Sequence, residues 1–266
     1  MDTNWAAAIM GVVEGLTEFV PVSSTGHLIL AGHLLHFDER LKDTFEIFIQ
    51  LGAILAVVAA YPGRFAGLLN FRRRDGFHGA RGLLLLACTT APAAAVGLAV
   101  HGYITRHLFS PLMVAAGLVA GGLWILIAER FPRAPKLEGV DALTWRDALA
   151  IGCFQCLSLW PGFSRSVSTI LGGMALGVDR KTSTEYSFFA AVPVLGLASL
   201  YSLAKGFSVL RASDLPAFAI GTAVSFLFGW LAVRFLIRFL SRHTLTVFGW
   251  YRLALAAGIG LLMLRA

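Results

Sequence analysis

Long apolar runs alternate with short polar loops along this chain. A helix needs about 20 apolar residues to cross a bilayer. Because hydrocarbon offers the backbone no hydrogen-bonding partners, such runs are expected to be helical. The pattern therefore predicts an all-α polytopic membrane protein with about six transmembrane helices. They fall near 44–61, 83–100, 111–128, 186–203, 215–233 and 246–264.

Two further apolar regions, near 4–30 and 148–176, are interrupted by Pro, Gly and polar residues. Broken backbone at membrane depth is tolerated only where protein or a water-filled cavity covers it. Both regions are therefore predicted to form re-entrant helix pairs, each entering and leaving from one side. The first has no Lys or Arg ahead of its apolar run and contains Glu14 and Glu18. We expect it to be retained rather than cleaved as a signal peptide.

The two interrupted regions resemble each other in sequence. GVVEGLTEFVP, from Gly11, matches GCFQCLSLWP, from Gly152, so that Glu14 aligns with Gln155. The favoured interpretation is one integral-membrane domain built from inverted repeats, with its broken helices meeting near the midplane. The alternative is a chance likeness between two helices broken by Gly and Pro. The predicted domain covers 1–266, and its repeats cover approximately 1–130 and 140–266.

Composition and charge support a membrane protein. The chain is 57% hydrophobic and only 14% charged, whereas a soluble domain is about a quarter charged. In a soluble protein the net charge of +7 would suggest nucleic acid, but here the basic residues cluster in short loops, so no nucleic-acid partner is expected. By the positive-inside rule, the basic loops are cytoplasmic. These loops are 62–82, 129–147 and 234–245; the loops 31–43, 101–110 and 204–214 then lie outside.

The first motif, EGLTEFVPVSSTGH at 14–27, gathers polar groups in an apolar region. They are Glu14, Glu18, Ser23, Ser24, Thr25 and His27. Ionisable groups at membrane depth cost several kcal/mol unless they are paired or in a wet cavity. Glu14 and Glu18 are four residues apart and so share a helix face. Two carboxylates this close repel each other, and two alternatives would relieve the repulsion. One is a shared divalent cation, Mg²⁺ or Ca²⁺, which prefers oxygen ligands. The other is a proton held by one carboxyl group, which would then act as an acid or base.

His27 follows Ser24 by three residues, so a local turn is expected to bring its ring near the Ser24 hydroxyl. That arrangement places a base beside a nucleophile. Alternatively, His27 itself attacks or protonates the leaving group. The simpler alternative for the whole motif is a polar seam between packed helices.

The second motif, PGFSRSVST at 161–169, predicts a phosphate cradle. Ser164 or Ser166 is expected to cap the following helix. A helix N-terminus attracts anions, and the forked donors of Arg165 suit phosphate. The simpler alternative is an arginine reaching the membrane interface beside small packing residues. Together the two motifs offer acid, metal site, nucleophile, base and clamp, a set that fits phosphoryl transfer.

These two segments resemble the signature motifs of the undecaprenyl pyrophosphate phosphatase family, the bacitracin-resistance type. The similarity covers most of the chain, including TFEIFIQLGAILAVV at 44–58 and IGCFQCLSLWPGFSRS at 151–166. The resemblance implies a metal-assisted enzyme of the bacterial inner membrane that hydrolyses undecaprenyl diphosphate to the monophosphate, recycling the lipid carrier for peptidoglycan synthesis. It also implies an inverted repeat with re-entrant helices, a site open to the periplasm, and often a homodimer.

The resemblance also assigns roles to individual residues. Glu14 and Glu18 are implied as metal-associated or acid–base residues, and Ser24 or His27 as the nucleophile. Arg165 is implied as the diphosphate clamp. The hydroxyls expected to help bind phosphate are those of Ser23, Thr25, Ser164, Ser166 and Thr169.

The second motif departs from the family pattern, which usually continues Ser-Gly-Ala-Thr. Here the chain has Ser166-Val167-Ser168-Thr169. Val167 places a branched side chain where the backbone is expected to approach phosphate. The sequence leaves open whether this reshapes the cradle, and it keeps Arg165 and Thr169 in place.

A rival function is transport of a polyprenyl phosphate across the membrane without hydrolysis, because inverted repeats with broken helices are also a transporter architecture. Transport needs an anion site but no nucleophile. The Ser24 and His27 pair beside two acids therefore favours the phosphatase.

Overall fold

The computed structural model describes residues 3–37, 39–73, 75–108, 110–206 and 211–265. Within these ranges the chain is helical, and its one extended pairing is a bridge between Leu137 and Val178. The helices of the N-terminal half are α1 (Thr3–Glu18), α2 (Ser24–Leu35), α3 (Glu39–Ala60), α4 (Pro62–Leu68), α5 (Gly79–His107) and α6 (Pro111–Arg130). Those that follow are η1 (Val140–Ala142), α7 (Trp145–Gln155), η2 (Cys156–Leu159), α8 (Arg165–Ala175), α9 (Arg180–Gly206), η4 (Ala212–Asp214), α10 (Leu215–Leu240) and α11 (Thr246–Arg265).

Three helical segments are long and apolar enough to span a membrane: Gly79–Ile104, Pro111–Arg130 and Ala212–Leu240. A fourth exists if the pair Thr44–Ala60 and Pro62–Leu68, bent by 90°, counts as one span. The all-helical prediction is therefore confirmed for the described residues, while the count of six spans stays a prediction.

Both interrupted regions break where the sequence predicts. α1 ends at Glu18 and α2 begins at Ser24, so Pro21 lies in the turn between them. η2 ends at Leu159 and α8 begins at Arg165. The residue before each second helix has positive φ: Ser23 at 71° and Ser164 at 79°. Such a conformation costs a non-glycine residue about 1–3 kcal/mol, and the two turns share it.

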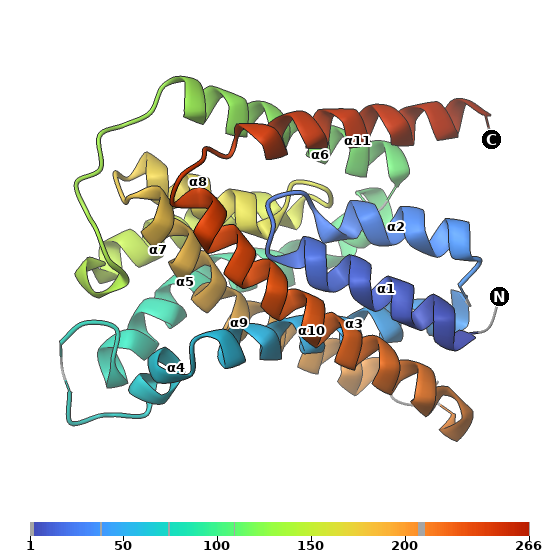
Figure 1. The fold of residues 1–266 in the computed structure, drawn as a ribbon, viewed down its shortest axis with the longest axis horizontal. Helices are drawn as coiled ribbons and strands as arrows, with labels where there is room; N and C mark the ends of the chain where they lie inside the picture. The colour runs from blue at the N-terminus through green and yellow to red at the C-terminus, as the bar shows by residue number, and fades with distance from the viewer. Residues whose placement is uncertain (1–2, 38, 74, 109, 207–210, 266) are drawn as a thin grey trace.

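The two broken helix pairs enter from opposite ends of the molecule (Figure 1). The start of α1 and the segment just after α2 pack with the start of α10, through Ala6, Phe37 and Phe218. At the other end, Ala175 of α8 accepts a hydrogen bond from Arg133 at 2.6 Å. The turns 19–23 and 160–164 meet between these ends.

Each broken pair packs its first helix closely on a long helix of the other half. A Cβ on Gly11 of α1 would lie 2.5 Å from the carbonyl oxygen of Gly221 in α10. A Cβ on Gly152 of α7 would lie 2.6 Å from the carbonyl oxygen of Thr89 in α5. Only glycine permits such an approach of two backbones. Gly11 and Gly152 are also the residues that begin the matching sequence segments.

The three basic loops lie at one end of the molecule, on the left in Figure 1. Asp141 accepts hydrogen bonds from Arg64 at 2.8 Å and from the backbone N–H of Phe77 at 2.6 Å. Partial burial raises the pKa of Asp141, but these hydrogen bonds outweigh it and hold that pKa below the ordinary value. Glu129 accepts from the N–H of Leu245 at 2.8 Å. The loops predicted to be cytoplasmic therefore share one end.

Candidate active site

The first turn places a hydroxyl on a buried carboxylate. Glu18 is the last residue of α1, and Ser24 is the first residue of α2. The Ser24 hydroxyl donates a hydrogen bond of 2.6 Å to Oε2 of Glu18. The break between the two helices therefore brings these residues together.

The second turn brings Arg165 to the same carboxylate. Its Nη2 donates to Oε1 of Glu18 at 3.1 Å, joining residues 147 apart in the sequence. Its Nη1 donates to the carbonyl oxygen of Ser187 at 3.0 Å and to the Ser187 hydroxyl at 3.1 Å. The guanidinium carbon lies 5.7 Å from the centre of the Phe19 ring, a cation–π contact. Each oxygen of Glu18 thus faces the first residue of one re-entrant helix, Ser24 or Arg165.

Two buried polar atoms in this cluster have no hydrogen-bond partner among the described residues. They are Nε of Arg165 and Oε2 of Glu14. Glu14 is buried and interacts electrostatically with Glu18, Glu46 and Arg165. An unpaired buried donor and an unpaired buried acceptor are costly in a folded protein. The cluster therefore holds one spare donor, suited to a phosphate oxygen, and one spare acceptor, suited to a cation or a proton.

Glu14 and Glu18 form at most part of a metal site. The described residues contain no group of three or more His, Cys, Asp or Glu side chains that could hold a metal ion. Both oxygens of Glu18 are engaged by Ser24 and Arg165. The spare oxygen of Glu14 fits a hard cation such as Mg²⁺ or Ca²⁺, whose other ligands would be substrate oxygens and water.

The hydroxyls of the second motif bond mostly within their own helix region. Ser164 caps α8, as predicted, because its Oγ accepts from the N–H of Val167 at 3.4 Å. Ser164 and Ser166 share a hydrogen bond of 2.9 Å between their hydroxyls. Thr169 lies within 2.7 Å of the Ser187 hydroxyl. Thr169 and Ser187 therefore form one polar unit beneath Arg165.

The Val167 side chain lies in the main hydrophobic core. It is 1% exposed and belongs to the same buried cluster as Ile170 and Leu171. Its effect on the phosphate cradle stays a prediction.

His27 faces other partners than Ser24. Its Nδ1 lies 2.7 Å from the carbonyl oxygen of Ser23, and its Nε2 lies 2.7 Å from the hydroxyl of Tyr251. A carbonyl oxygen only accepts, so Nδ1 carries a proton; in the neutral ring, Nε2 accepts from Tyr251. The expectation that a local turn brings this ring to the Ser24 hydroxyl is corrected: that hydroxyl donates to Glu18 instead.

The remaining predicted hydroxyls lie beside this cluster. Ser23 is buried and contributes its carbonyl oxygen to His27. Thr25 is half-buried in the first turn of α2. The structure thus brings together Glu14, Glu18, Ser24 and Arg165, with His27 held next to them by its own partners.

Sequence reasoning missed Ser187, Tyr251 and Arg252. Arg252 is fully buried in α11 and donates to carbonyl oxygens in both re-entrant turns, at Pro21 and Gly162. A signal for it existed, since a basic residue within the apolar run 246–264 marks a functional site by default. Ser187 and Tyr251 carried no such signal.

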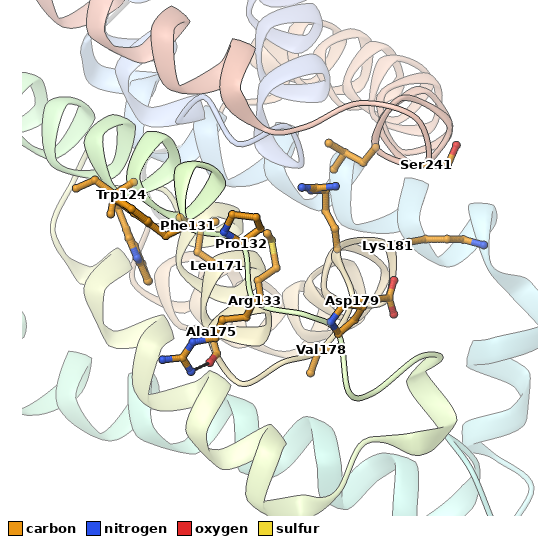
Figure 2. Close-up of a pocket in the computed structure, with 16 residues that line it drawn as sticks. Trp124, Phe131, Pro132, Arg133, Leu171, Ala175, Val178, Asp179, Lys181 and Ser241 are labelled. Carbon is orange, nitrogen blue, oxygen red and sulfur yellow. Dashed lines mark hydrogen bonds between the residues drawn. The ribbon is translucent and has the colours of Figure 1, made fainter.

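A separate cavity of about 700 Å³ lies at the end of the basic loops. Figure 2 shows its lining, which includes Trp124, Arg133, Leu171, Asp179 and Lys181. None of the predicted site residues lines it. The candidate active site is therefore the buried cluster between the turns, not this cavity.

Comparison with known proteins agrees with the motifs. Residues 7–258 match the model of the family described as "Bacitracin resistance protein BacA". A protein of Maridesulfovibrio salexigens named "Undecaprenyl-diphosphatase" is 52% identical over 256 residues, covering 96% of this chain and 97% of that protein. One of the same name from Oleidesulfovibrio alaskensis is 50% identical, covering 94% and 95%. "Undecaprenyl-diphosphatase 1" of Chromobacterium violaceum is 50% identical, covering 92% and 91%.

The family match covers both turns of the candidate site. Together with the apolar helices, it makes this an integral membrane protein. The chain belongs to the bacitracin resistance protein BacA family.

Proposed function

We propose that this protein is a membrane phosphatase that hydrolyses undecaprenyl diphosphate to undecaprenyl phosphate and inorganic phosphate. The observation that carries the proposal is the carboxylate of Glu18, which meets a hydroxyl on one oxygen and a guanidinium on the other. The names of relatives about half identical over nearly the whole chain support the same activity. By releasing the monophosphate, the enzyme recycles the lipid carrier for peptidoglycan synthesis, which accounts for resistance to bacitracin.

Arg165 is the clamp for the diphosphate. Its Nε has no hydrogen-bond partner among the described residues and is available to a phosphate oxygen. Its Nη2 donates to Glu18 in this structure and would donate to a second phosphate oxygen when substrate binds. A planar guanidinium binds phosphate through two parallel hydrogen bonds. Thr169 and the cap residue Ser164 hold the helix start from which Arg165 projects.

Ser24 is the nucleophile favoured by the geometry. Its Oγ attacks the terminal phosphorus while its proton passes to Glu18, and the bond from phosphorus to the bridging oxygen breaks. Undecaprenyl phosphate leaves, and water then attacks the phosphoserine to release inorganic phosphate and restore the hydroxyl. The lone pair of His27 faces Tyr251 instead, so His27 is better placed to orient water or the leaving group than to attack.

Glu14 would hold the divalent cation, Mg²⁺ or Ca²⁺, and Glu18 would join it only where Ser24 or Arg165 releases one of its oxygens. The spare buried oxygen of Glu14 supports this assignment. When bound, such a cation neutralises the charge that develops on the transferred phosphoryl group. Transport without hydrolysis would leave the bond between Ser24 and Glu18 unexplained, so we do not propose it.

We further propose the finer architecture: inverted repeats, six spans, a bacterial inner-membrane location, a site facing the periplasm, and a homodimer. The matched packing of Gly11 and Gly152 supports the inverted repeats. The shared end of the three basic loops supports their common cytoplasmic placement. A reporter fused after Arg73 should therefore read as cytoplasmic in cells; a periplasmic reading would invert the orientation.

The test of the activity is phosphate release by the purified protein from undecaprenyl and farnesyl diphosphates. Wild type should turn over, Ser24→Ala should lose at least about 100-fold in kcat, and His27→Ala should lose less. Thr17→Val is the matched control, because the Thr17 hydroxyl bonds only to its own helix, at the carbonyl oxygen of Val13. If the wild-type protein releases no phosphate but moves polyprenyl phosphate across liposome membranes, transport would replace hydrolysis as the proposed function. Full activity in Ser24→Ala would exclude Ser24 as nucleophile.

A further inference from the structure

Arg252 is a buried arginine whose hydrogen bonds, among the described residues, all go to main-chain carbonyl oxygens. Its relative exposure is 0%. The acceptors are Pro21 at 3.4 Å, Gly117 at 3.2 Å, Leu118 at 3.3 Å, Gly162 at 2.8 Å and Phe163 at 2.9 Å. Burying a charge without a carboxylate partner costs several kcal/mol. A protein that keeps such a group gains something other than a simple ion pair.

Those acceptors come from three separate segments. Pro21 lies in the first re-entrant turn, Gly162 and Phe163 lie in the second, and Gly117 lies in α6. Pro21 is three residues before Ser24, and Phe163 is two residues before Arg165. One planar group therefore fixes the two backbones that place Ser24 and Arg165 on Glu18.

Glycines of α6 make room for this arrangement. A Cβ on Gly121 would lie 2.4 Å from Nη2 of Arg252. A Cβ on Gly117 would lie 2.4 Å from the carbonyl oxygen of Pro161. Contacts under 3.0 Å force a shift, so α6 accepts the guanidinium and the second turn only with glycine at both places.

The preceding residue, Tyr251, contacts the site by another route. Its hydroxyl lies 2.7 Å from Nε2 of His27, a residue 224 positions away. The two ring planes are 2° apart and the ring centres 5.6 Å apart, so the rings are nearly parallel and meet edge to edge through this contact. A partner on one ring nitrogen sets the tautomer and orientation of a histidine.

We propose that Tyr251 and Arg252 are positioning residues for the phosphatase site, an inference that rests on the proposed function. Arg252 keeps the two re-entrant turns in register, and Tyr251 fixes the ring of His27. α11, the last helix of the chain, thereby holds both halves of the site together. Neither residue touches the substrate.

The first arm of the test is Arg252→Lys, which keeps the charge but loses the planar fork. We expect kcat to fall on the order of 100-fold, since misplacement by about 1 Å has effects of that size, with KM changing much less. Gly121→Ala, which displaces the guanidinium without removing it, should lower kcat in the same direction. Arg234→Lys is the control, because Arg234 stacks on Trp230 of its own helix away from the site.

A second readout does not need turnover. If Arg252 pins both turns, Arg252→Lys should speed hydrogen exchange by about tenfold in peptides covering 19–23 and 160–164 together. Loosening of one turn alone, or full kcat with unchanged exchange, would overturn the role of Arg252. Should Arg252→Lys fail to fold, Gly121→Ala carries both measurements.

The second arm is a double-mutant cycle between Tyr251 and His27. Tyr251→Phe keeps the aromatic ring and removes one hydrogen bond, so kcat should fall by about tenfold and the pH–rate profile should shift. In a His27→Ala background the same change should have no further effect. Tyr103→Phe is the control, since Tyr103 stacks on His107 outside the site. An equal loss in both backgrounds would overturn the role of Tyr251.

Histidine-ring NMR separates this inference from the proposed function. The signals of His27 should move in Tyr251→Phe and stay in Tyr103→Phe, whether or not the protein turns over. Unmoved signals would refute the contact. An inactive wild type with moved signals would refute only the phosphatase proposal.

Discussion

The two re-entrant turns share a backbone and differ in chemistry. Each places a positive-φ serine, Ser23 or Ser164, directly before its second helix. The first residue of that helix is Ser24 in one turn and Arg165 in the other, and both meet the carboxylate of Glu18. Under the proposed function, the first turn supplies the reacting groups and the second turn the binding groups.

The aligned residues Glu14 and Gln155 sharpen this difference. Gln155 donates to the carbonyl oxygen of Thr89 at 3.1 Å, which ties α7 to α5. Each residue has one buried oxygen without a partner among the described residues. The second segment thus uses this position to join helices, whereas the first keeps a carboxylate there, which the proposed function uses for chemistry.

The largest effect is expected where the turns meet. Arg165→Ala should lower phosphate release at least about 1,000-fold, since the clamp supplies most of the charge stabilisation. It should also destabilise the protein by about 3–5 kcal/mol, because Glu18 is left buried and unpaired. Phosphate release and thermal unfolding in detergent measure the two effects. In Glu18→Gln/Arg165→Met, stability should return while activity stays lost; near-normal turnover in Arg165→Ala would exclude the clamp.

Exchanging the aligned residues tests the division between the halves. Glu14→Gln should lower kcat about 100-fold with little loss of stability, because shape is kept and a buried charge is removed. Gln155→Glu should cost about 1–3 kcal/mol or more, since it loses a buried donor and sets a carboxylate against a carbonyl oxygen. Activity per folded molecule should survive in Gln155→Glu. The reverse pattern would mean that the halves are not divided in this way.

Removal of divalent cations should lower activity through the acidic residues of the first turn and not through Arg165. EDTA should lower turnover by at least about tenfold, and Mg²⁺ or Ca²⁺ should restore it. Glu14→Gln should respond less to added cation than wild type does. Full activity in metal-free buffer would remove the cation from Glu14 and Glu18 and leave a proton-transfer role for these acids.

The smallest effect concerns the helix caps. Ser164→Ala should cost about 1 kcal/mol, because its side chain caps α8. Ser23→Ala should cost almost nothing by this route, since Ser23 makes no side-chain capping bond to α2. Thermal unfolding of the two variants measures the difference. Equal losses would show that the cap at Ser164 is not the relevant contact.

Much of this arrangement could be predicted from local sequence. Pro21 and Pro161 mark both breaks, since proline and its predecessor disfavour a continuing helix. The charge pattern alone groups the basic loops. These predictions succeed because each depends on proline or on charged residues. The conformational preference of proline and the cost of burying a charge are large at any position in a membrane protein.

What escaped prediction depends on contacts between distant segments. The partner of His27 is Tyr251, one aromatic residue among many in the apolar runs, and Ser187 is one hydroxyl among many. The bend of 90° after Ala60 changes which residues count as a span. Arg252 was visible in the sequence, but only the folded backbone shows that its donors face carbonyl oxygens.

The entry of the two helix pairs from opposite ends has a consequence for sidedness. Neither turn belongs to one face of the molecule, so the catalytic cluster does not itself determine the leaflet from which a head group arrives. The leaflet is determined instead by the two ends of the molecule, which differ. One end carries the basic loops and their cavity, and the other carries the starts of α1 and α10. Relatives could therefore change their direction of access through loops and helix ends while keeping every reacting residue in place.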